Sequence, residues 1–175
     1  GEEAVCLEVG SGWEGATKGL REVYDRVVTI DKNRQTINRQ TKADPDFLVE
    51  VEKGREREEG IVQWLATRAG VRQGELQAIW ASPSCKEETA AAAINKGRKG
   101  SAGHYAGTPR SDEAQAGLDA MLKGIVEATD KDPRVQTCIE NPWVTALALE
   151  PSSTDRWGQG EKVYGCAYGA PTKKP

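Results

Sequence analysis

The N-terminal part of the chain contains the pattern that most constrains the fold. Residues 4–9 form a short apolar run, the glycine turn Gly10-Ser11-Gly12 follows at once, and residues 14–24 carry apolar side chains at helical spacing. A second short run, residues 27–30, is rich in β-branched side chains and ends at Asp31. Strand, glycine turn, helix, strand and acidic residue make one βαβ unit, whose two strands are parallel. The pattern therefore predicts an α/β fold.

The rest of the chain continues this alternation of strands and helices. Between residues 36 and 60 the chain is polar, and we expect an exposed connection with one short strand or helix near Phe47-Leu48-Val49. Further strands are expected at 76–80, 135–139 and 163–168, and helices at 58–69, 87–94 and 111–128. The alternation predicts a mostly parallel sheet with helices on both faces.

Polar segments follow the predicted strands at the points where the strands end. These segments are Gly10–Trp13, Asp31, Ser82–Cys85 and Glu140–Trp143. Ligands of parallel α/β sheets bind beyond the carboxyl ends of the strands. We therefore expect four separate segments to converge on one crevice.

Composition limits the class of protein. The chain has 175 residues, of which 29% are charged, with a net charge of −3, and 37% are hydrophobic. These values predict one globular domain over residues 1–175 rather than a globally basic nucleic-acid binder. No apolar run approaches the length of about 18 residues that a membrane span needs. Four cysteines without a CxxC pair and a single histidine predict no metal site and favour a reducing compartment, the nucleus or cytoplasm, with an organelle as the alternative.

The glycine turn and the acidic residue predict a nucleoside site. Glycine has no Cβ, so a ligand can approach the backbone of the turn closely. Asp31 is placed to accept hydrogen bonds from a ribose diol. Gly15 comes one residue too early for the GxGxxG spacing of dinucleotide-binding turns, which weakens that interpretation. The alternative is a tight turn followed by a solvated acid.

Cys85 and Glu140 are the candidate catalytic residues. Cys85 follows a strand and precedes a predicted helix, and a helix N-terminus favours the nucleophilic thiolate. Glu140 ends another strand about 55 residues later, in the segment IENP at 139–142. The alternatives are an inert buried thiol and a helix-capping acid.

In this order, these segments resemble motifs of a known family. The segment EVGSG at 8–12, with Asp31, resembles the first motif of S-adenosylmethionine-dependent methyltransferases. The segments WASPSC at 80–85 and IENP at 139–142 are similar to motifs of the DNA cytosine-C5 methyltransferases, above all of the short methyltransferase-like proteins of viruses, phages and protists. The tail YGCAYG at 164–169 also resembles theirs. The resemblance covers roughly residues 4–170.

The resemblance implies a Rossmann-like methyltransferase fold, S-adenosylmethionine as cofactor and DNA as partner. Cys85 would add to C6 of a flipped cytosine, and Glu140 would hold the N3/N4 edge of that base. The cofactor would be bound by Glu8, Gly10, Ser11, Gly12, Trp13, Asp31 and Pro83. Asn141 and Pro142 would shape the base pocket, and the basic loop residues Lys96, Arg98, Lys99 and Arg110 would meet phosphates. The alternative for that loop is an exposed, solvated connection.

The sequence also departs from the family pattern. Ser84 stands where the family has a second proline before the nucleophile, and neither the C-terminal arginine motif nor a target-recognition domain is visible. Truncation at the C-terminus would account for the missing motif. Two alternatives to DNA methylation follow. One is a catalytically degenerate fold that serves as a binding or scaffold subunit of a larger assembly. The other is a transferase with the same cofactor acting on RNA or another substrate.

Overall fold

A computed structural model of the chain describes residues 3–11, 15–32, 35–36, 42–49, 60–82 and 112–140, with side chains everywhere in these ranges except 35–36, 42–43 and 112–118. The chain divides into two compact units, residues 1–83 with 116–140 and residues 84–115 with 141–175. Nearly all the described residues belong to the first unit. One domain over the whole chain stays a prediction.

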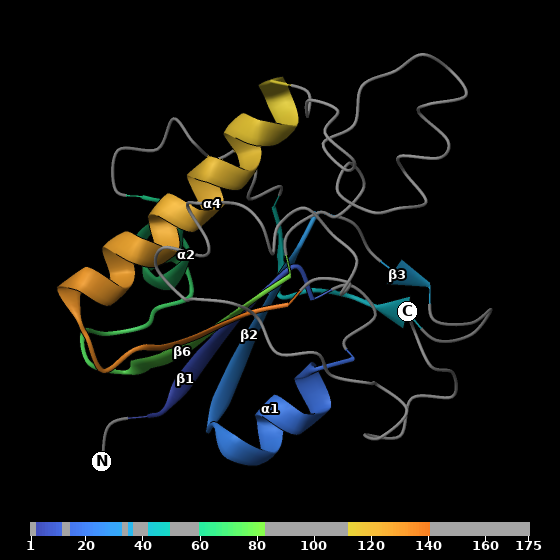
Figure 1. Ribbon diagram of the computed structural model, residues 1–175. Coiled ribbons are helices and arrows are strands. Elements are labelled where there is room, and N and C mark those ends of the chain that lie inside the picture. Colours follow the sequence, from blue (N-terminus) through green and yellow to red (C-terminus); the bar gives the residue numbers. More distant parts are fainter. Residues whose placement is uncertain are drawn as a thin grey trace. The chain divides into compact units, whose positions relative to one another are not determined.

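Five strands of the first unit form a sheet in which every neighbouring pair is parallel (Figure 1). In chain order they are β1 (Val5–Val9), β2 (Arg26–Asp31), β5 (Phe47–Leu48), β6 (Leu76–Ala81) and β7 (Gln136–Ile139). In space the order is β5-β2-β1-β6-β7. The chain thus moves outward from β1 to β5 and then crosses to the other side of β1 for β6 and β7. The predicted α/β fold with a parallel sheet is confirmed for these strands.

Strand β1 lies at the centre of the sheet and is buried along its whole length. Helix α1 (Thr17–Val23) covers one face of the sheet, where Leu20 and the following Tyr24 pack against Cys6, Val27 and Ala78. Helices α2 (Ile61–Arg68) and α4 (Asp112–Lys131) lie on the opposite face (Figure 1). Covering both faces explains why β1 has the nearly continuous apolar sequence typical of parallel sheets.

Helices α2 and α4 pack closely where a glycine of one meets the first residue of the other. A Cβ atom on Gly124 would lie 2.6 Å from Cγ2 of Ile61. Both helices bury an apolar stripe at this face. The stripe consists of Ile61, Val62, Leu65 and Ala66 on α2, and Met121, Leu122 and Ile125 on α4. Close approach of the two backbones therefore depends on the absence of a side chain at Gly124.

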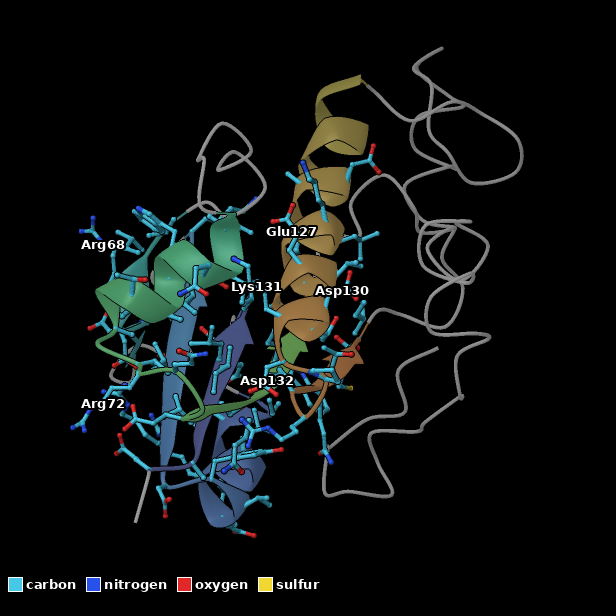
Figure 2. The ribbon with its side chains drawn as sticks, turned by 90° about the vertical axis from the view of Figure 1, so that its left-hand side faces the viewer. Arg68, Arg72, Glu127, Asp130, Lys131 and Asp132 are labelled. Atoms are coloured by element: carbon cyan, nitrogen blue, oxygen red, sulfur yellow. The ribbon has the colours of Figure 1, made fainter. Side chains whose placement is uncertain are left out.

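A carboxylate of α4 lies at the beginning of α2. A Cβ atom on Gly60, the residue before α2, would lie 2.6 Å from Oε2 of Glu127. Figure 2 shows Glu127 on the side of α4 that faces α2. Helix α2 has no acidic residue in its first turn and no side-chain cap. The charge of Glu127 therefore lies near the positive end of the helix dipole, where a negative charge is favourable.

Several element boundaries differ from the predictions. Helix α1 begins at Thr17 rather than at residue 14, because Gly15 and Ala16 form a turn. Helix α4 runs past residue 128 to Lys131 and ends directly before Asp132-Pro133. The connection after β2 contains β5 and also a small antiparallel pair that was not predicted, β3 (Gln35–Thr36) with β4 (Lys42–Ala43). The predicted helix 87–94 and strand 163–168 lie outside the described residues.

The contact between α2 and α4 predicts opposite effects for two glycine-to-alanine substitutions. Gly124→Ala should lower the free energy of unfolding by about 1–3 kcal/mol, because the new methyl group overlaps Ile61. Gly19→Ala on α1, where a Cβ meets nothing within 4 Å, should raise it by about 0.5–1 kcal/mol. Urea unfolding followed by circular dichroism measures both. Equal effects of the two substitutions would contradict the close packing of the helices.

Candidate functional site

The carboxyl ends of the five strands lie along one edge of the sheet. The strand register places one residue of each strand in a single row, namely Phe47, Ile30, Val9, Ala81 and Ile139. The next residues along the strands are Leu48, Asp31, Gly10, Ser82 and Glu140. The described members of the four polar segments therefore lie along this edge, as their positions after the strands predicted.

Backbone hydrogen bonds hold this edge together. The N–H groups of Gly10 and Ser11 both donate to the carbonyl oxygen of Ile30, at 2.8 and 3.0 Å. The same pattern continues at the other strand ends, where the Ser82 N–H donates to Val9 at 2.8 Å, the Glu140 N–H to Ala81 at 2.8 Å, and the Val49 N–H to Asp31 at 2.9 Å. The residues that end each strand are therefore attached to the neighbouring strand rather than leaving the sheet freely.

The direction of the chain through the sheet reverses between β1 and β6, where Gly10 and Ser82 meet. Gly10 has a φ of 81°, and a Cβ atom on it would lie 2.5 Å from the backbone oxygen of Ser82. Both the backbone conformation and the lack of space require glycine. The structure thus gives Gly10 a role in joining two strand ends, because the Ser82 backbone occupies the space that the missing side chain leaves.

Ser11 places an unsatisfied hydroxyl beside this reversal point. The residue is only 6% exposed, and its Oγ is one of two buried side-chain polar atoms of the described residues without a hydrogen-bond partner. Leaving a buried hydroxyl unpaired costs about 1–3 kcal/mol. In a native structure such a group is explained by a binding or catalytic role, by strain, or by a bound water molecule or ion. A bound ligand with a polar group at this position is one such partner.

Glu8 lies inside the unit, two residues before Gly10. Its side chain accepts a hydrogen bond from Oγ1 of Thr17, with Oε2 and Oγ1 2.5 Å apart, and the two residues are 2% and 1% exposed. The sequence resemblance implied a cofactor contact for Glu8, whereas the contact seen here is with the first residue of α1. Thr17 was not singled out from the sequence. The signal in the sequence was a hydroxyl residue five positions after Gly12.

Asp31 ends β2 with a partly buried side chain. Beside it, Thr29 and Asp46 bind each other reciprocally. The Thr29 N–H and hydroxyl donate to Oδ2 of Asp46 at 2.9 and 3.2 Å, and the Asp46 N–H donates to the Thr29 hydroxyl at 3.0 Å. These hydrogen bonds attach the start of β5 to β2 and so hold Asp31 in place at the edge of the sheet.

The two described cysteines are poor nucleophiles. Burial, with the nearby charge of Glu8, raises the pKa of Cys6 to about 12. Cys138 lies on β7 and is exposed, and partial desolvation together with the charge of Glu140 raises its pKa. The thiolate is the reactive form of cysteine, and a raised pKa makes it scarce at neutral pH. Neither residue therefore competes with the nucleophile that the sequence predicts.

Many predicted site residues lie outside the described part of the chain and stay predictions. These are Gly12, Trp13, Pro83, Cys85, Lys96, Arg98, Lys99, Arg110, Asn141 and Pro142. Within the described ranges, no group of three or more histidine, cysteine, aspartate or glutamate residues could hold a metal ion. No helix in those ranges combines the length and apolar character needed to cross a membrane.

Comparisons with known proteins add no relative. The chain matches no protein-family model, no curated protein and no solved structure. The site is therefore defined by its own geometry and by the motifs of the sequence.

The contact between Gly10 and Ser82 predicts a large loss of stability when a side chain is added. Gly10→Ala should lower the free energy of unfolding by roughly 2–4 kcal/mol, because the residue is in the left-handed region and overlaps a carbonyl. Gly15→Ala, where a Cβ meets nothing within 4 Å, is the matched control and should change it by less than about 0.5 kcal/mol. Thermal unfolding that does not distinguish the two variants would argue against this strand-end contact.

The pKa directions predict how the described thiols react with iodoacetamide. At about pH 8, the buried Cys6 should stay unmodified in the native protein. The exposed Cys138 should react, but more slowly than a free thiol, since its raised pKa leaves less thiolate. Glu140→Gln removes a negative charge that raises the pKa of Cys138, so its alkylation should accelerate about two-fold or more. Glu127→Gln on α4 is the control substitution. Peptide mass mapping over time measures the rates, and an unchanged rate at Cys138 would mean that Glu140 has no influence there.

Proposed function

We propose that this chain is an S-adenosylmethionine-dependent methyltransferase with a Rossmann-like fold that acts on C5 of cytosine in DNA. The observation that carries the proposal is the buried, unpartnered hydroxyl of Ser11 at the point where the parallel sheet reverses direction. Ligands of open α/β sheets bind at such reversal points, beyond the carboxyl ends of the strands.

The arrangement of strands supports a nucleoside cofactor. Counted along the five-stranded sheet, the order β5-β2-β1-β6-β7 corresponds to the order 3-2-1-4-5 of doubly wound nucleotide-binding folds. Ser11 would bind a polar group of the cofactor, and Asp31, at the end of the neighbouring strand, would accept hydrogen bonds from its ribose. Gly12, Trp13 and Pro83 are assigned to the same site from the sequence. When bound, S-adenosylmethionine supplies an electrophilic methyl group.

The positions of Ser82 and Glu140 support a shared base pocket. They end adjacent strands, since Ala81 pairs with Ile139 and the Glu140 N–H donates to Ala81. Cys85 follows Ser82 by three positions in the sequence. From the sequence motifs, we propose that Cys85 and Glu140 act on one base.

Each proposed residue has one role in the reaction. The Cys85 thiolate adds to C6 of a cytosine that has left its stack, which makes C5 nucleophilic. Glu140 holds the N3/N4 edge and stabilises the positive charge that develops on the ring. After methyl transfer, a water molecule takes the proton from C5, and the electrons of that C–H bond re-form the C5–C6 double bond as the thiolate leaves C6. Asn141 and Pro142 would shape the pocket, and Lys96, Arg98, Lys99 and Arg110 would bind DNA phosphates.

One feature of the sequence favours a second candidate, a catalytically degenerate domain that binds within a larger assembly. Ser84 replaces the second proline of the nucleophile motif. A transferase acting on RNA or another substrate is the third candidate. The experiments below separate the three.

Calorimetry with S-adenosylhomocysteine tests the cofactor site. The protein should bind the compound, and Asp31→Ala should weaken binding by about ten-fold, since a buried polar group of the ligand then loses its partner. Gln63→Ala, at an exposed position of α2 outside the proposed site, is the control. If the wild-type protein binds nothing at about 1 mM ligand, the cofactor assignment is wrong.

Trapping on DNA that contains 5-fluorocytosine tests the reaction, because fluorine at C5 prevents release of the enzyme. With S-adenosylmethionine present, we expect a covalent adduct that survives denaturing electrophoresis and disappears in Cys85→Ser. Cys138→Ser should keep the adduct, and Glu140→Gln should slow its formation by about 10²–10³-fold. Cofactor binding without an adduct on DNA would favour the binding subunit, and an adduct on RNA alone would favour the third candidate. Methylation that persists in Cys85→Ser would overturn the nucleophile assignment.

A further inference from the structure

We propose that the buried pair Glu8–Thr17 positions the ligand-binding turn after β1, so that Thr17 controls ligand affinity although it acts only through the turn. This inference rests on the proposed ligand site at Ser11. It assigns to Glu8 a positioning role in place of the direct cofactor contact that the sequence suggested. It also adds Thr17, which no motif of the sequence contains.

The pair is a strong and directional link. Oγ1 of Thr17 and Oε2 of Glu8 are 2.5 Å apart, and both residues are almost completely shielded from water. Hydrogen bonds from a hydroxyl to a carboxylate are short and are stronger than those between neutral groups. Because both residues are shielded from bulk water, loss of the donor is costly for the buried carboxylate. This bond therefore fixes where the first residue of α1 lies on β1.

Beyond its C-terminal end, α1 is held to the start of β1 because the Ala4 N–H donates to Oδ2 of Asp25 at 2.8 Å and the Arg26 N–H donates to the Ala4 carbonyl oxygen at 3.1 Å. At its N-terminal end, few other described groups could fix the helix. The helix spans only Thr17–Val23, the residue before it makes no side-chain cap, and Thr17 is its one fully buried residue. Leu20 and Tyr24 pack against Cys6, Val27 and Ala78, but apolar contacts are non-directional and tolerate sliding. The hydrogen bond to Glu8 is the directional contact that the structure shows at the start of this helix.

The turn is attached to the sheet at both of its ends. At the first end, the N–H groups of Gly10 and Ser11 donate to Ile30. At the second end, Thr17 donates to Glu8, which lies two residues before Gly10 on the same strand. The length of chain between the two attachments is constant, so a shift of Thr17 changes the conformations available to the turn. Ser11 and Asp31 would then no longer lie at the spacing that lets both bind one ligand.

The test compares four proteins: wild type, Thr17→Val, Thr17→Ser and Ile125→Val. Thr17→Val keeps the shape and removes the donor, whereas Thr17→Ser restores the donor. Ile125→Val removes a buried methyl group from α4 on the opposite face of the sheet and controls for a general loss of stability. Binding of S-adenosylhomocysteine is measured by calorimetry at a temperature where circular dichroism shows all four to be folded. If Thr17→Val does not fold, Glu8→Gln takes its place.

The expected result is a dissociation constant about ten-fold or more higher for Thr17→Val, with Thr17→Ser and Ile125→Val close to wild type. Hydrogen exchange without ligand should show faster exchange at the amides of Gly10 and Ser11 in Thr17→Val, relative to Val28 in the same sheet. Affinity within two-fold of wild type for Thr17→Val, or an equal loss in Ile125→Val, would overturn the positioning role.

The two proposals fail in distinguishable ways. If the wild-type protein does not bind S-adenosylhomocysteine, the cofactor assignment fails and the exchange experiment alone decides the role of Thr17. If the wild type binds and exchange at Gly10 and Ser11 is the same in wild type and Thr17→Val, only the positioning role fails.

Discussion

The parallel contact between β1 and β6 is the constraint on which the rest of this structure depends. The chain leaves β1 to one side, builds β2 and β5, and must return across the sheet to place β6 against the other side of β1. Both edges of β1 are then paired and both faces are covered, so its side chains must be apolar or internally satisfied. At its end the two backbones come so close that only glycine fits, and Gly10 meets the Ser82 carbonyl there. The candidate site lies along the edge of the sheet that forms when β6 pairs with β1.

Buried polar groups near this contact divide into two kinds. Glu8 and Thr17 are hydrogen-bonded to each other inside the unit, as are Thr29 and Asp46 on the next strand. In the described part of the chain, the Ser11 hydroxyl has no hydrogen-bond partner. A folded protein gains specificity from the first kind, since a directional bond selects one arrangement of helix and strand. The second kind costs stability in the free protein unless a partner from outside the chain, such as a ligand or a water molecule, completes it. The proposed function depends on this difference.

Much of the fold could be predicted from short sequence patterns. The runs around β1, β2, β6 and β7 are apolar and bounded by glycine, proline or acidic residues, and each became a strand of the sheet. Helices α2 and α4 followed from apolar spacing and from the breaking effect of Asp132-Pro133. The pair β3–β4 could not be predicted, because two-residue strands carry no periodicity and form only through their partner. The start of α1 was placed too early for a related reason. Apolar spacing continued through Gly15 and Ala16, although these residues form a turn.

By itself, the sequence determined that strands and helices alternate, that the strands are parallel and that polar residues follow their carboxyl ends. These properties depend on local preferences and on the short connections that parallel strands require. Only the tertiary structure decided the order of the strands, the reason why residue 10 must be glycine and the partner of Glu8. Each of these depends on contacts between residues far apart in the chain, such as Gly10 with Ser82. A local sequence pattern does not specify which distant segment will pack against it. The unsatisfied Ser11 hydroxyl is also decided by the tertiary structure, because burial without a hydrogen-bond partner is a property of the folded unit.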